Sequence, residues 1–130
     1  MPLAVTSAYA ALLALLFVLL SVRVIGQRRS ARVSLGDGGD TELIRRTRVH
    51  ANFAEYVPLT LILMMLAELQ GQPSWRIHLI GVLLLIGRAA HAYGVSHAPQ
   101  IVALRLVGMI GTIAAIVTGA LVNLAAALAR

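Results

Sequence analysis

Polar and charged side chains recur within apolar stretches of this 130-residue chain, at spacings that could build a binding site for an anion. Arg48, Asn52 and Glu55 are spaced i, i+4, i+7, which places them on one face of a helix, with Tyr56 beside them. An ionisable group in a membrane span costs several kcal/mol unless it is paired or hydrated. Side chains of this kind in such a stretch are therefore candidates for function.

Two further apolar stretches carry charge. Arg88 and His91 are spaced i, i+3, and Arg105 lies little more than a turn into the last stretch. Three arginines and one glutamate leave an excess of positive charge, which a bound anionic ligand would satisfy most simply. A structural alternative remains for each feature: Arg48 and Glu55 could form an intrahelical pair, and His91 alone could be a packing residue.

Several other chemistries are excluded or not indicated. The chain has no cysteine, which excludes disulfides, thiolate nucleophiles and cysteine-based metal sites. No histidine and carboxylate spacing resembles a metal site such as His-Glu-x-x-His, so no metal is expected. The net charge of +6 does not indicate a nucleic-acid partner, because the arginines flank and enter apolar stretches.

The elements that must position these residues are helices in a lipid bilayer. Hydrophobic residues make up 59% of the chain and charged residues 12%, and the mean hydropathy is +0.87. A hydrocarbon core of ~30 Å needs roughly 20 helical residues. The sequence predicts an all-α membrane protein, a four-transmembrane-helix bundle forming a single domain over 1–130. The predicted helices cover about 3–25, 43–69, 75–96 and 100–129.

The arginines also predict the orientation of this bundle. By the positive-inside rule, the first and third loops face the cytoplasm and both termini face the periplasm. The charged groups of the last three helices then fall at a similar depth on the cytoplasmic side. A stripe of small residues follows Arg105 on its own face, which predicts close helix packing and a site at a helix–helix or subunit interface. The arginines around the first loop are Arg23, Arg28, Arg29, Arg32, Arg45, Arg46 and Arg48.

Over nearly its whole length the chain resembles the membrane-associated proteins in eicosanoid and glutathione metabolism, the MAPEG family. The short length and the Gly-Asp-Gly-Gly loop resemble a bacterial member. The helix motif is fairly specific, whereas the two shorter motifs would be weak alone. The motifs are Arg45-x-x-Arg48-x-His50-x-Asn52-x-x-Glu55-Tyr56-x-Pro58, Gly87-Arg88-x-x-His91 and Leu104-Arg105.

The resemblance implies a homotrimer in the bacterial inner membrane that binds reduced glutathione as co-substrate between subunits, with the site open to the cytoplasm. Arg105 would lie beside the glutathione sulfur as the catalytic residue. Arg28 or Arg29 would reach the site from the neighbouring subunit. The remaining glutathione ligands would be Arg48, Asn52, Glu55, Tyr56, Arg88 and His91.

The implied activity is a glutathione-dependent transferase or peroxidase acting on lipophilic electrophiles or hydroperoxides that enter from the bilayer. Val95 stands where the eicosanoid-producing branches carry a tyrosine, and Leu106 brings no hydroxyl beside Arg105. Both departures argue against leukotriene or prostaglandin synthesis. The alternative is a non-catalytic membrane protein that binds glutathione or another small anion. A small exporter of cationic drugs is a third class, but it would need unpaired acidic residues.

Overall fold

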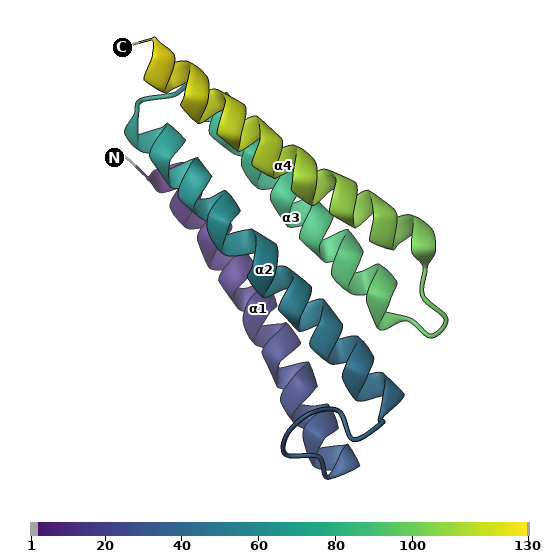
Figure 1. Ribbon diagram of the computed structural model, residues 1–130. Coiled ribbons are helices and arrows are strands. Elements are labelled where there is room, and N and C mark those ends of the chain that lie inside the picture. The colour runs from purple at the N-terminus through teal and green to yellow at the C-terminus, as the bar shows by residue number, and fades with distance from the viewer. Residues whose placement is uncertain (1–2, 130) are drawn as a thin grey trace.

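The computed structural model describes residues 3–129, which form four long helices in an up-and-down arrangement. They are α1 (Ala4–Ala31), α2 (Thr41–Leu69), α3 (Ser74–Ser96) and α4 (Val102–Leu128). Successive helices run antiparallel, and the start of α1 lies at the same end of the bundle as the end of α4 (Figure 1). α1 packs on α2 and α3 but does not touch α4. The predicted all-α, four-helix fold is confirmed.

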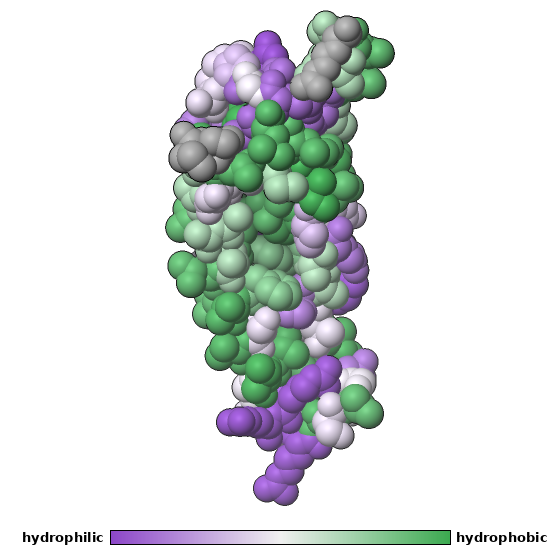
Figure 2. Space-filling view, turned by 90° about the vertical axis from the view of Figure 1, so that its left-hand side faces the viewer, coloured by the Kyte–Doolittle hydropathy of each residue, from purple (hydrophilic) through white to green (hydrophobic). Residues whose placement is uncertain are grey.

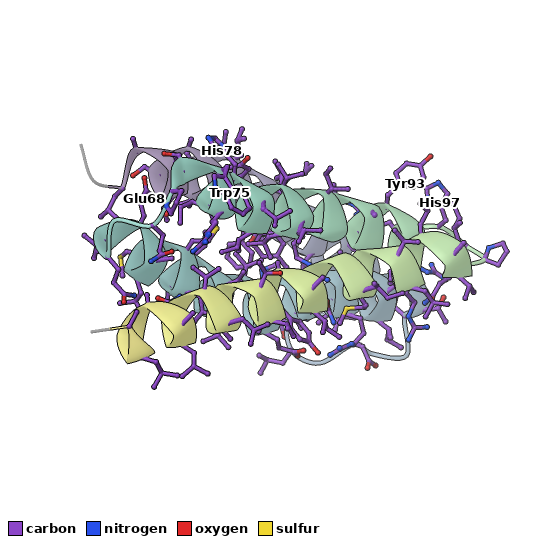
Figure 3. The ribbon with its side chains drawn as sticks, turned by 90° about the horizontal axis from the view of Figure 1, so that it is seen from above. Glu68, Trp75, His78, Tyr93 and His97 are labelled. Atoms are coloured by element: carbon purple, nitrogen blue, oxygen red, sulfur yellow. The ribbon has the colours of Figure 1, made fainter. Side chains whose placement is uncertain are left out.

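All four helices are long and apolar enough to cross a membrane. Large apolar side chains are exposed on every helix, as lipid contact requires. Figure 2 shows a largely apolar middle on one face, with hydrophilic residues at the two ends and a further hydrophilic patch along one edge. Trp75 and Tyr93, exposed near opposite ends of α3, lie where aromatic side chains gather at membrane interfaces (Figure 3). The chain is therefore an integral membrane protein.

Helix α1 continues to Ala31, beyond the predicted end near Ile25. The apolar run stops at Ile25, but after Gly26 the next residues include good helix formers, two arginines and an alanine among them, and no proline. The helix ends at Arg32, which adopts a left-handed conformation with φ 55°. The predicted polar loop then turns through Gly36, Gly38 and Gly39, all with positive φ.

Side chains also close the ends of the helices. The Asp40 carboxylate caps α2 by accepting the Leu43 N–H at 2.7 Å. α1 begins without a side-chain cap of its own. Instead, Glu68 at the far end of α2 accepts the N–H groups of Val5 and Thr6 through its two carboxylate oxygens, at 2.9 and 2.7 Å. This carboxylate fastens the start of α1 to the end of α2.

Helices α3 and α4 approach closely along small residues. A Cβ atom added to Gly108 would lie 2.5 Å from the His91 backbone nitrogen. A Cβ atom added to Gly87 would lie 2.9 Å from the Gly108 carbonyl oxygen and from the Thr112 nitrogen. The predicted stripe is confirmed as a packing surface, and its buried members are Gly108, Thr112, Ala115 and Gly119.

Candidate anion-binding site

Helices α2, α3 and α4 enclose a pocket of about 250 Å³ near the end of the bundle where α3 joins α4. Each helix contributes residues that the sequence singled out, and the structure brings them together at one place. The pocket has both polar and apolar walls, and it is lined by Arg48, Asn52, His91, Val95, Gln100, Arg105 and Met109.

Arg88 lies behind this pocket and is the largest fully buried side chain, with 1% of its surface exposed. Its Nε–H donates to the Thr112 hydroxyl at 2.9 Å, and its Nη1 donates to the Asn52 side-chain oxygen. Its Nη2 lies 3.3 Å from the Met109 sulfur, and its Cζ lies 5.7 Å from the centre of the Tyr56 ring. These partners hold the guanidinium rigidly.

None of these partners carries a full negative charge, and Arg88 forms no ion pair within residues 3–129. The Thr112 hydroxyl donates to the Gly108 carbonyl at 2.8 Å, which leaves its oxygen to accept from Arg88. The Asn52 oxygen is likewise turned towards Arg88. The positive charge is therefore fixed in place and uncompensated beside the pocket, which is the electrostatic condition for binding an anion.

Arg48 and Arg105 lie at the rim of the pocket, whereas Glu55 is not among its lining residues and contacts Arg48 from outside. Arg48 Nη1 lies 3.6 Å from Glu55 Oε1, so the intrahelical pair considered from the sequence is present. Both side chains are more than half exposed, and a pair of this kind contributes only about 0–1 kcal/mol. A ligand could therefore recruit either member. Arg105 Nη1 donates to the Gln100 side-chain oxygen at 3.3 Å and is otherwise exposed.

His91 and Val95 form the α3 wall. His91 is 5% exposed, and its ring makes no hydrogen bond with any other residue between 3 and 129, so its nitrogens are available to a ligand in the pocket. Val95 is also 5% exposed and supplies an apolar surface without a hydroxyl group. The departure noted in the sequence thus lies inside the pocket, where a side chain could influence chemistry.

Arg28 and Arg29 do not join this pocket within one chain. Arg28 Nη1 donates to the Gly36 carbonyl at 2.7 Å and lines a second pocket, also about 250 Å³, together with Thr47 and Arg48. Arg29 lines a different depression at the end of α1. Contact with the site of a neighbouring subunit, as the resemblance implies, stays a prediction for both.

Sequence reasoning missed two residues of the pocket. Met109 could have been found, because it lies one helical turn after Arg105 and therefore on the same face. Gln100 gives no comparable signal, since it sits in the turn between α3 and α4. Its contact with Arg105 depends on how that turn folds back.

The fold and the site together define a class: an integral membrane protein with four helices and an arginine-rich pocket shared by three of them. A model of the MAPEG family matches residues 6–125, and the chain belongs to this family. The chain is 39% identical over 120 residues to inner membrane protein YecN of Escherichia coli K12. The same protein from E. coli O6:H1 strain CFT073 has the same identity, and the match covers 92% of this chain and 90% of each relative.

Proposed function

We propose that the chain is a glutathione-dependent membrane transferase or peroxidase that acts on lipophilic electrophiles or hydroperoxides. The observation that carries this proposal is the set of three arginines from three helices, Arg48, Arg88 and Arg105, with a single carboxylate, Glu55, among them. Glutathione has two carboxylates and one ammonium group, which suit several guanidinium groups and one carboxylate.

In this proposal each residue of the site would have a role that fits its position. Arg88 supplies a buried positive charge and holds the Asn52 side chain towards the pocket. Arg48 would pair with a glutathione carboxylate and release Glu55 to receive the ammonium group. Tyr56 would remain under the Arg88 guanidinium at the edge of the site. His91 would complete the polar wall on α3.

Arg105 would act on the sulfur. A positive charge beside a thiol stabilises the thiolate and lowers the pKa of the thiol, so the proton would pass to water and leave a nucleophile. The thiolate would then attack an electrophilic carbon arriving from the lipid, and a leaving group would depart with the electron pair of its broken bond. With a hydroperoxide, the thiolate would take the terminal oxygen as the O–O bond breaks and an alcohol forms. A second glutathione would then reduce the resulting sulfenic acid, giving glutathione disulfide and water. A chain without cysteine would obtain its nucleophile in this way.

The proposal includes an assembly and a location. The subunits would form a homotrimer with glutathione between neighbours, in the bacterial inner membrane, with both termini periplasmic and the site open to the cytoplasm. Arg28 is the better candidate to extend the site, because it already shares a pocket with Arg48 within one chain. The name of the E. coli relative describes it as an inner membrane protein, which supports this location.

The deciding experiment titrates the purified protein in neutral detergent with reduced glutathione and follows the ultraviolet absorbance of bound thiolate near neutral pH. The intact protein should give a stoichiometric signal, Arg105→Leu should lose it, and Arg105→Lys should retain part of it because the charge remains. Arg76→Leu is the matched control, since it removes an arginine from the other end of the bundle. Equal thiolate signals in Arg105→Leu and the control would refute the assigned role.

The same titration separates an enzyme from a binder. A non-catalytic anion binder would take up glutathione, measured by calorimetry, without forming thiolate. Glu55→Gln should weaken the affinity for glutathione about tenfold, while leaving the thiolate signal at saturation unchanged. If no glutathione binds to the intact protein, the arginines serve another anion.

A further inference from the structure

The outer face of α1 is an apolar stripe that ends in arginines. Only Thr6, Leu13 and Leu20 of this helix are buried, one residue in every seven, so a single narrow edge faces the bundle. On the remaining surface, large apolar side chains follow one another at intervals of three to four residues. The exposed ones are Leu12, Leu15, Val18, Leu19, Val22 and Ile25.

The length of α1 places its last turns among the lipid headgroups. Its 28 residues span about 42 Å, whereas the hydrocarbon core is about 30 Å thick and the bilayer with its headgroups about 40–45 Å. Arg29 follows Ile25 at i+4 and continues the same helical face, and Arg32 follows as the left-handed residue that ends the helix. They therefore lie one to two turns beyond the last apolar residue of the stripe.

These arginines surround a shallow depression of about 360 Å³. The side chains of Arg29 and Arg32 make no hydrogen bond or ion pair with any residue between 3 and 129, and both residues are exposed. No acidic residue lines the depression. Its lining is Ile25, Arg28, Arg29, Arg32, Val33 and Ser34, and the three arginines face it mainly with the apolar stems of their side chains.

We propose that this depression binds one anionic glycerophospholipid, with its phosphodiester between Arg29 and Arg32 and its acyl chains along the apolar stripe of α1. Guanidinium groups pair with phosphate oxygens through two parallel hydrogen bonds, which suits two neighbouring arginines. Continuity with Ile25 favours a lipid over a soluble phosphate ester, because the apolar wall leads directly from the depression to the stripe. The arginines of α2 offer no equivalent, since Arg45 and Arg46 are already paired with Glu42.

Native mass spectrometry of the full chain in neutral detergent tests the proposal, with phosphatidylglycerol and phosphatidylcholine as the two probes. The intact protein should retain one phosphatidylglycerol per chain in preference to phosphatidylcholine. Each arginine near the phosphate should contribute about fivefold to this preference, so Arg29→Gln/Arg32→Gln should reduce it about thirtyfold. A matched control, Arg45→Gln/Arg76→Gln, removes the same charge elsewhere and should keep the preference.

Two kinds of lipid-binding result would overturn the assignment, and a result on glutathione binding would do so separately. The first kind concerns the preference for phosphatidylglycerol over phosphatidylcholine, either absent already in the intact protein or retained by Arg29→Gln/Arg32→Gln as strongly as by the control variant. The other is displacement of the lipid by equimolar glycerol phosphate, which lacks acyl chains and would show that the stripe contributes nothing. Glutathione binding is measured in the same variants as a separate readout. If Arg29→Gln/Arg32→Gln loses glutathione and keeps its lipid, these arginines belong to a neighbour's glutathione site and the lipid proposal fails.

Discussion

The close approach of α3 and α4 at Gly108 predicts a large response to a single methyl group. In Gly108→Ala the new Cβ would lie 2.5 Å from the His91 nitrogen, 2.7 Å from the Gly87 oxygen and 2.7 Å from the His91 Cα. Ordinary contact begins near 3.4 Å, and all three atoms are backbone, so the helices themselves must separate by roughly 1 Å. Overpacking of this kind costs about 1–3 kcal/mol.

The separation would also reach the buried arginine. The Thr112 hydroxyl that accepts from Arg88 is one turn further along α4, and hydrogen bonds to charged groups contribute about 1.5–3 kcal/mol. Alanine is a better helix former than glycine, which stabilises the folded state by about 1 kcal/mol and offsets part of this loss. We therefore expect Gly108→Ala to lower the free energy of unfolding by about 2–4 kcal/mol.

Gly26 provides a matched control, because a Cβ atom added there meets nothing within 4 Å. Gly26→Ala should leave stability unchanged or raise it by up to about 1 kcal/mol. Both variants would be unfolded by adding SDS to mixed micelles, with helix content followed by far-UV circular dichroism. Equal stability of the two variants would show that α3 and α4 do not pack along this stripe.

Two smaller predictions concern the ends of the helices. Glu68→Ala should speed amide hydrogen exchange in the first turn of α1, because the Val5 and Thr6 N–H groups lose their acceptor. It should lower the free energy of unfolding by about 1–2 kcal/mol, a range that allows for the partial exposure of the carboxylate. Unchanged exchange would mean that this cap does not form. The pKa of Asp40 is held below its ordinary value of 3.8, chiefly by the Leu43 N–H and then by the Gln27 side chain. Its folded-state pKa is depressed, so the capping contribution is present above about pH 4 and lost as pH falls through the folded value. Protection from exchange at the start of α2, after correction for the intrinsic pH dependence of exchange, should therefore fall in acid. In Asp40→Asn, which has no charge to lose, this protection should stay constant over the same pH range.

Much of the fold was readable from hydropathy, because a helix in lipid must satisfy its own backbone and needs a long apolar run to cross. The loop between the first two predicted helices was readable from its glycines, and Gly36, Gly38 and Gly39 all have positive φ. The end of α1 could not be predicted in this way. A prediction of membrane spans measures the length of an apolar run, whereas a helix continues as long as its backbone hydrogen bonds can form. Sequence therefore located the membrane segments better than the helix ends.

The site was predicted in part for a similar reason. Helical periodicity showed that Arg48 and Asn52 share a face, and antiparallel spans placed Arg88 and Arg105 at the same depth. Periodicity could not show that Arg88 would be buried behind the pocket on neutral partners while Arg105 stayed exposed at its rim. That difference depends on the rotation of each helix about its own axis, which packing decides.

The contact between Glu68 and the start of α1 has a consequence for the order in which the protein can be made. The two partners are 62 and 63 residues apart, at the beginning of the first span and the end of the second. During synthesis, α1 enters the bilayer with its first amide groups still dependent on water. They find their permanent acceptor only when α2 has crossed back and brought Glu68 to the same side. Helices α1 and α2 can thus complete each other as a hairpin before α3 is needed, whereas the pocket requires α2, α3 and α4 together.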